Sequence, residues 1–245
     1  MSKQIFGVPG RDTKDGRFLT RSAKANGLVF TTLHHGFDPS DYDPTIESGT
    51  LPEDLPTQTT FALTELGKVL AEAGSSLENV VRTTIFVNSP DGDAVEQANA
   101  AAVEFFAANG IVRAPAFATW RGELVDSGVA ADMVATVPGD SVSRTGGFLR
   151  IPPQSGAGGG VGTSEQTEAC LSRILAVLEA NGSRLDKLVK VQVFMADIGE
   201  KHGLYNPTYN EFFHSRGILQ KPARSTLGVE LDPGELIRME AIAYE

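Results

Sequence analysis

The sequence predicts an α/β (α+β) protein built from two tandem domains, each a mixed sheet with two helices packed on one face. The first observation is a repeat: residues 58–87 match residues 166–195 at a constant offset, with Gln58 matching Gln166 and Phe86 matching Phe194. The second is that helical and strand-like segments follow the same order in both copies. The third is a hydrophobic content of 41% over 245 residues, which fits two small domains.

The first copy contains two helical segments between strand-like runs. Residues 57–73 place Phe61, Leu66 and Leu70 at helical spacing, and Gly74 is a typical stop signal. Residues 81–87 alternate and are rich in β-branched side chains, which predicts a strand. The expected order is strand 27–33, loop 36–56, helix 57–73, strand 81–87, helix 94–108 and strands 116–124 and 129–137.

The second copy repeats this order. Thr163 and Gln166 predict a capping box at the start of its first helix. The two closing strands flank Asp232-Pro233-Gly234, a turn signal that predicts a hairpin. A connector near Pro138 divides the chain into domains 1–138 and 139–245. The expected elements are strand 146–153, helix 163–180, strand 188–196, helix 202–216 and the closing strands within residues 221–245.

Composition argues against several classes of function. A net charge of −10 without a basic cluster argues against nucleic-acid binding, which needs Lys and Arg to neutralise phosphates. Cys170 is the single cysteine, so no intrachain disulfide is possible, and four histidines without a metal-ligand pattern argue against a metal site. No signal segment and no run of about 18 apolar residues occur, so a cytoplasmic protein that binds no membrane is expected. The glycine run 155–162 lacks the Lys-Ser/Thr of a phosphate loop, so it predicts a flexible loop.

Arg224 and Glu240, in the two closing strands, are the pair best suited to chemistry. A guanidinium can hold a substrate carboxylate through two parallel hydrogen bonds, and a partly buried carboxylate can move a proton. Because side chains alternate along a strand, the two face one cavity only in a register of the right parity, such as 226 opposite 240. A structural salt bridge at the start of the strand is the alternative for Arg224.

The end of the chain also resembles a known family. Residues 222–226 (PARST), the proline-bearing turn and residues 239–243 (MEAIA) are similar to the C-terminal signature of the Rid family. These are the YjgF-like reactive-intermediate deaminases, once labelled L-PSP ribonucleases. The resemblance implies a chorismate-mutase-like fold, trimers with sites between neighbouring domains, and deamination without metal or cofactor. It also implies that Arg224 binds substrate and that Glu240 positions or activates water.

The two copies depart from the family pattern in different ways. Phe117 stands at the arginine position of the first copy, and Asp132 stands where the second copy has Glu240. The family's serine corresponds to Thr32 in the first copy and to Pro152 in the second. No single copy therefore holds the full set of site residues.

Two further positions bear on the site. The family's early tyrosine corresponds to Leu19 in the first copy and Gly139 in the second. His34 follows Thr32 closely, and two interpretations are open: a surface pair with His35, or a neutral imidazole that lines a cleft and shuttles a proton.

These observations lead to one hypothesis, in which both copies contribute to a single inter-domain cleft. The expected function is a metal-free hydrolytic deaminase that releases ammonia from a small imine or enamine bearing a carboxylate. The expected residues are the catalytic Glu240, Thr32 and His34 and the substrate-binding Arg224, Phe117 and Gln154. The alternatives are a non-catalytic binding or scaffold protein, and a lyase, isomerase or cyclase using the same cleft. Expected partners are a small carboxylate and other copies of the chain, with a trimer favoured.

Overall fold

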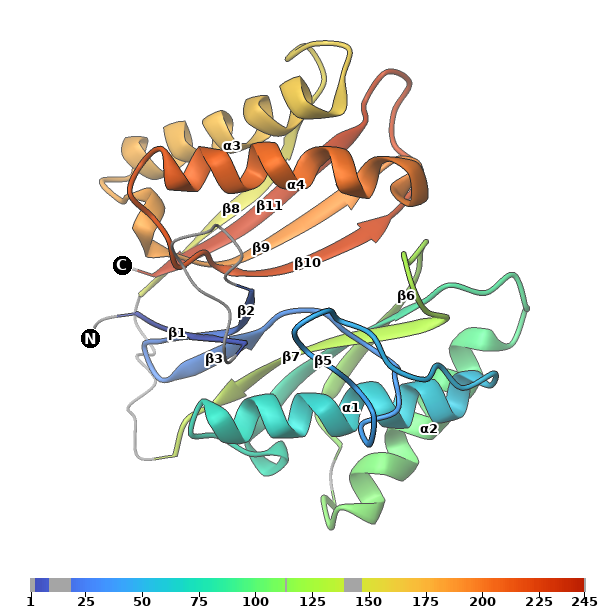
Figure 1. The fold of residues 1–245 in the computed structure, drawn as a ribbon. Coiled ribbons are helices and arrows are strands. Elements are labelled where there is room, and N and C mark those ends of the chain that lie inside the picture. The colour runs from blue at the N-terminus through green and yellow to red at the C-terminus, as the bar shows by residue number, and fades with distance from the viewer. Residues whose placement is uncertain (1–2, 9–18, 113, 139–146, 245) are drawn as a thin grey trace.

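The computed structural model describes residues 3–8, 19–112, 114–138 and 147–244. It has two α/β units, one above the other in Figure 1, with their sheets facing each other and their helices on the two outer sides. Each pair of helices buries one face of its own sheet, which is the usual way for a mixed sheet to form a core. The inner faces of the two sheets form the boundary between the domains, and the predicted fold class is confirmed.

The first domain is a sheet covered by two long helices. Its strands run in the order β1-β2-β3-β7-β5-β6, and β4 pairs with β7 beside this path. Its elements are β1 (Gln4–Gly7), β2 (Thr20–Ala25), β3 (Leu28–Thr31), β4 (His34–His35), α1 (Leu55–Glu72), the short 3₁₀ helix η1 (Leu77–Asn79), β5 (Val80–Val87), α2 (Ala94–Ala108), β6 (Ala116–Arg121) and β7 (Val129–Thr136).

The second domain repeats this plan with a sheet in the order β10-β9-β11-β8. Its elements are β8 (Phe148–Ser155), α3 (Thr163–Ala180), the 3₁₀ helix η2 (Leu185–Lys187), β9 (Leu188–Met195), α4 (Ile198–His214), β10 (Ala223–Gly228) and β11 (Ile237–Tyr244). The predicted boundary between the domains adjoins residues 139–146, which lie outside the described residues, so it stays a prediction.

The closing strands do not form the predicted hairpin. β9 lies between β10 and β11, running parallel to β10 and antiparallel to β11. The physical reason is that β9, α4 and β10 form a strand–helix–strand unit, whose crossover returns the chain parallel to its first strand. The turn at residues 232–234 therefore carries the chain across β9 instead of reversing it onto β10.

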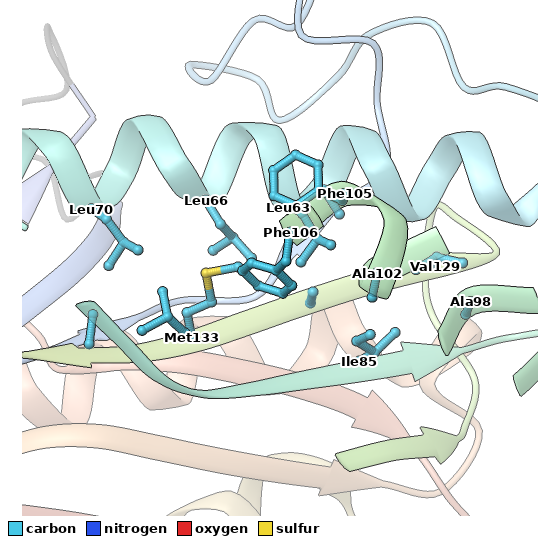
Figure 2. Close-up of a cluster of buried hydrophobic side chains, with 14 of the residues drawn as sticks. Leu63, Leu66, Leu70, Ile85, Ala98, Ala102, Phe105, Phe106, Val129 and Met133 are labelled. Atoms are coloured by element: carbon cyan, nitrogen blue, oxygen red, sulfur yellow. The ribbon is translucent and has the colours of Figure 1, made fainter. Parts of the chain in front are cut away.

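The helical predictions agree closely with the structure. α2 and α3 have the predicted bounds, whereas α4 begins at Ile198, a turn earlier than predicted, after Asp197 in a left-handed conformation with φ 51°. Figure 2 shows how the two helices of the first domain pack on their sheet through one apolar cluster. Its labelled members are Leu63, Leu66, Leu70, Ile85, Ala98, Ala102, Phe105, Phe106, Val129 and Met133.

Two buried glutamines explain why the repeat includes polar positions at the starts of helices. The side-chain oxygen of Gln58 in α1 accepts the backbone N–H groups of Gly128 and Val129, at 2.8 and 3.0 Å. The side-chain oxygen of Gln166 in α3 accepts the N–H of Leu236 at 2.8 Å. Each glutamine thus satisfies backbone donors in the segment that leads into the last strand of its domain, which a buried loop requires.

Gln166 is therefore not part of the predicted capping box with Thr163. The N-cap of α3 is Gly162, and the Glu165 carboxylate accepts its backbone N–H at 2.7 Å. The predicted box therefore lies one residue too late in the chain. The Gln166 side chain instead accepts a hydrogen bond from the loop in front of β11.

A buried ion pair joins the two sheets. Lys190 Nζ of β9 donates to Asp132 Oδ2 of β7 at 2.8 Å, to the Ser225 hydroxyl at 2.6 Å and to the Thr31 carbonyl at 2.7 Å. The Ser225 hydroxyl in turn donates to the same Asp132 oxygen at 2.6 Å. All three ammonium donors are used, which offsets much of the cost of burying a charged pair.

Apolar contacts and one backbone pair complete this boundary. Two clusters cross it, one with Ala23, Ala25, Phe30, Val189, Ala223 and Tyr244, the other with Phe86, Leu124, Ala130 and Leu227. Glu123 and Gly228 exchange two backbone hydrogen bonds, at 2.8 and 2.7 Å. A Cβ at Gly228 would lie 2.5 Å from the Glu123 Cβ, so the close approach requires glycine.

Replacing Asp132 by Asn should destabilise the fold strongly, because Lys190 then stays buried without a carboxylate. We expect the free energy of unfolding to fall by about 3–5 kcal/mol, the usual cost of breaking a buried ion pair. Glu240→Gln is the matched control: Glu240 holds the equivalent register position but lies 3.9 Å from the exposed Arg150. It should cost less than about 1 kcal/mol. Urea titrations measure both, and equal losses would contradict a structural role for the buried pair.

Candidate functional site

Arg224 and Glu240 lie on opposite faces of the second sheet. Arg224 of β10 pairs with Val191 of β9, and Val191 pairs with Ala241 of β11. Glu240 pairs instead with Gln192, one residue further along β9. Since paired residues share a face and faces alternate, Arg224 points to the helix side and Glu240 to the first domain. The prediction that these two side chains face one cavity is therefore wrong within one chain.

The Arg224 guanidinium rests on two buried tyrosines of α4. Its central carbon lies 5.0 Å from the Tyr205 ring centroid and 4.8 Å from that of Tyr209. Among the described residues it has no hydrogen-bonding or carboxylate partner, so the predicted alternative of a structural salt bridge finds no support. The hydroxyl of Tyr209, beside it, is buried and also lacks a hydrogen-bond partner. A half-buried cation without an anion beside it is a natural carboxylate-binding group.

Arg224 opens into a cavity of about 370 Å³ between the two domains. β2 and the β3–β4 segment of the first domain form one wall, and α4 with the start of β10 forms the other. The Leu33 N–H donates to the Arg224 carbonyl at 3.2 Å, which holds the two walls together. We call this space the interface cavity. Its polar lining residues are Thr20, Thr32, His35, Glu47, Asp126, His202, Asn206, Tyr209, Asn210, Lys221, Arg224 and Thr226.

Thr32 lines the interface cavity as predicted, but His34 does not. The Thr32 hydroxyl donates to the Arg21 carbonyl at 3.1 Å, which leaves its oxygen to accept from His34 Nε2 at 3.3 Å. His34 is only 5% exposed, and burial lowers its pKa to about 3, so its imidazole stays neutral. Neither interpretation from the sequence holds for His34, because it lies behind Thr32 and away from both the surface and the cavity. It positions the threonine hydroxyl.

His35 is the histidine that reaches the cavity from this strand. The Ser127 hydroxyl donates its one proton to the Val129 carbonyl at 2.8 Å, so it accepts from His35 Nδ1 at 2.7 Å. This places the proton of the neutral ring on Nδ1 and leaves Nε2 as a proton acceptor. Burial lowers the pKa of His35, which keeps the ring neutral near pH 7.

His202 and Asp126 add titratable groups to the same cavity. Burial, and after it the positive charge of Arg224, lowers the pKa of His202 to about 4. The Asp126 carboxylate, which lines the same cavity, opposes the lowering of the pKa of both His202 and His35. These residues carry no motif in the sequence. The only available signals are that His35 adjoins His34 and that His202 precedes Tyr205 by about one helical turn.

Glu240 lines a different and larger space. A cavity of about 510 Å³ lies between the inner faces of the two sheets, and its lining includes Arg82, Trp120, Asp132, Arg150 and Glu240. The carboxylate of Glu240 lies 3.9 Å from the Arg150 guanidinium. We call this space the central cavity, and Arg224 is not among its lining residues.

Phe117 and Gln154 are absent from the lining of either cavity. Phe117 pairs with Thr83 of β5, the register position that Arg224 holds against β9 in the second domain. The Gln154 side chain donates to the carbonyl of Pro152 at 2.7 Å. A phenyl ring does stand in place of the arginine, as the aligned copies predict.

The aligned positions of the other copy do not carry the groups that line the interface cavity. Pro152 and Pro153 of β8 align with Thr32 and Leu33, and they offer neither a hydroxyl nor a backbone N–H. Phe117, on the edge strand β6, replaces the guanidinium. Within the described part of the chain there is thus one set of candidate site residues, supplied by the β3–β4 segment of the first domain and by β10 and α4 of the second.

The described residues contain neither a metal-ligand cluster nor a membrane-spanning helix. No group of three or more His, Cys, Asp or Glu residues among them is arranged to hold a metal ion. No helix in residues 3–8, 19–112, 114–138 and 147–244 is long and apolar enough to cross a membrane.

Comparison with known proteins gives two consecutive matches to one family model. The model described as endoribonuclease L-PSP matches residues 15–138 and again residues 140–245. A RutC family protein of Pyrococcus abyssi is 36% identical over 100 residues, which cover 40% of this chain and 75% of the relative. A Salmonella typhimurium protein named 2-iminobutanoate/2-iminopropanoate deaminase is 33% identical over 104 residues, covering 42% and 79%. The match to protein HMF1 of Saccharomyces cerevisiae is 40% identical over 83 residues but spans 60% of that protein.

Solved structures similar to this one each cover about half of the chain. A YjgF family member from Neisseria meningitidis is 23% identical, covering 56% of this chain and 96% of its own, with a TM-score of 0.41. The YjgF gene product of E. coli is 18% identical, covering 54% and 92%, with a TM-score of 0.41.

Replacing His34 by Gln, the residue at the aligned position 154, should make stability less sensitive to acid. The unfolded chain takes up a proton at His34 below about pH 6.5, whereas the folded protein does not until about pH 3. Stability from this neutral group is full above pH 6.5 and falls by about 1.4 kcal/mol per pH unit between pH 6 and pH 4. We expect the variant to lose that contribution to the slope. Urea titrations at pH 4, 5 and 6 measure it, and identical slopes would contradict a buried neutral His34.

Proposed function

Since the chain belongs to the endoribonuclease L-PSP (Rid) family in two tandem copies, we propose that it is a metal-free hydrolytic deaminase. The substrate is a small imine or enamine that bears a carboxylate, and the reaction releases ammonia. The relative named as a 2-iminobutanoate/2-iminopropanoate deaminase supports the reaction class. We place the site in the interface cavity, and we also propose that three chains assemble into a trimer.

The observation that carries this proposal is the unpaired Arg224 guanidinium at the cavity wall. Two aromatic faces hold it in place, so little side-chain entropy is lost when an anion binds. A substrate carboxylate accepts two hydrogen bonds from the guanidinium fork. This contact orients the neighbouring imine carbon toward the wall that carries Thr32 and His35.

The neutral histidines of the same cavity carry out the proton transfers. His35 Nε2 accepts a proton from the attacking water, and the Ser127 hydroxyl holds the ring in the required tautomer. The tetrahedral intermediate then expels ammonia, and the carbon becomes a carbonyl. His202 and Asp126 line the same space and can return a proton to the leaving nitrogen. Glu240 has no part in this proposal, because it faces the central cavity.

Arg224→Gln should remove most of the activity and leave the fold intact. The shorter, neutral amide remains polar but loses both charged hydrogen bonds, so kcat/KM should fall about 100-fold or more. The assay is ammonia release from 2-iminobutanoate generated in situ, with thermal unfolding as the check on folding. Phe117→Ala is the matched control, because Phe117 holds the same register position in the first domain and is expected to have near wild-type kcat/KM.

Two outcomes would contradict the proposal. Equal losses in Arg224→Gln and Phe117→Ala would mean that the arginine has no special role. A folded wild-type protein that releases ammonia no faster than buffer would favour a binding protein, or a different reaction in the same cleft.

A further inference from the structure

Lys221 is a second cation in the interface cavity, and the hydrolytic steps above leave it unused. It lies at the entrance to β10, three residues before Arg224, and both residues line the cavity. Lys221 is only 7% exposed. Its backbone carbonyl accepts the Thr20 hydroxyl at 2.8 Å, which fixes this stretch against the first domain.

The ammonium group of Lys221 has no acceptor or carboxylate within bonding distance among the described residues. Buried lysines are rare unless they are paired, because the charged form loses its hydration. Burial, and after it the positive charge of Arg224, lowers the pKa of Lys221 to about 8. A considerable fraction of the side chain is therefore a neutral amine at mildly alkaline pH.

A neutral lysine amine in such a setting is a nucleophile toward carbonyl and imine carbon. Desolvation and a neighbouring cation are the two means by which proteins activate lysine for this chemistry. The cavity supplies both, and it also holds the proposed carboxylate anchor. An α-carboxylate bound to Arg224 would bring the adjacent sp² carbon into the space that Lys221 borders.

We propose that Lys221 Nζ forms a Schiff base with 2-oxo and 2-imino acids whose carboxylate is held by Arg224. With an imino acid, the neutral amine adds to the C=N carbon, a proton passes to the departing nitrogen, and ammonia leaves. The new C=N bond joins the substrate carbon to Nζ. Water then adds to this carbon, the bond to Nζ breaks, and the 2-oxo acid leaves while the lysine amine is restored. This route replaces the direct attack of water on the imine, so His35 Nε2 takes its proton from the water that hydrolyses the Schiff base. The sum is still the hydrolysis of one imine by one water, with no oxidant or reductant.

This inference rests on the proposed function for its substrate, but the covalent step can be tested apart from turnover. Pyruvate with sodium cyanoborohydride at pH 8 should convert the Schiff base to a stable secondary amine. Peptide mass spectrometry should locate this adduct at Lys221 and find little of it at Lys201, a half-buried lysine of α4 whose ammonium group pairs with Asp197. Arg224→Gln should reduce the labelling of Lys221 at least tenfold, because the keto acid is no longer anchored.

Lys221→Arg separates a covalent role from a purely electrostatic one. The variant keeps the positive charge but has no amine that can form a Schiff base. We expect ammonia release to fall about 100-fold or more, while Lys201→Met, the control lysine variant, keeps wild-type activity. Labelling of wild-type protein needs no variant, so it stays informative even where a substitution disturbs folding.

The two proposals fail in different ways. Labelling of Lys221 no higher than that of Lys201, or wild-type ammonia release by Lys221→Arg, overturns the covalent step and leaves the hydrolytic deaminase standing. Labelling of Lys221 without any ammonia release supports the Schiff base and overturns the deaminase.

Discussion

The contact on which the rest of the structure depends is the buried pair of Lys190 and Asp132. It connects the central strand of the second sheet to a central strand of the first, and the Ser225 hydroxyl bonds to both partners. Ser225 is the residue after Arg224, so the same network that joins the domains fixes β10 beside the β3–β4 segment. Apolar contacts are not directional, so they do not by themselves fix how one sheet lies on the other. A buried charged pair with defined hydrogen bonds does.

The two copies contribute different groups to the candidate site. The first domain supplies a hydroxyl and an oriented imidazole, whereas the second supplies the guanidinium and the tyrosines beneath it. The complementary positions hold other residues, with Phe117 in place of arginine and Pro152 in place of threonine. In an assembly of identical single-domain copies, both walls of such a cleft would come from the same sequence, so every copy would need every group. A fused pair is free of that constraint, which explains why neither half carries the complete set.

The sequence predicted the tandem fold, the bounds of α2 and α3, and the equivalence of Phe117 and Arg224, because these depend on local periodicity and on the repeat. It did not predict which face Glu240 occupies. β9 lies between the two closing strands and its pairing with each of them decides that face. An expectation based on direct pairing of the closing strands therefore fails. Similarly, the sequence does not show that His35, and not His34, faces the interface cavity, because the pairing of β4 with β7 decides which ring points to that side. No sequence motif marks Lys221. Its burial depends on the packing of residues that are far apart in the sequence.

The most direct test of a single site shared by both domains is a crystal structure with 2-oxobutanoate bound at a concentration near its dissociation constant. The account predicts one ligand per chain in the interface cavity, with its carboxylate on the Arg224 guanidinium and its C2 carbon on the side of Thr32 and Lys221. A ligand in the central cavity beside Glu240 and Arg150, with the interface cavity empty, would contradict it.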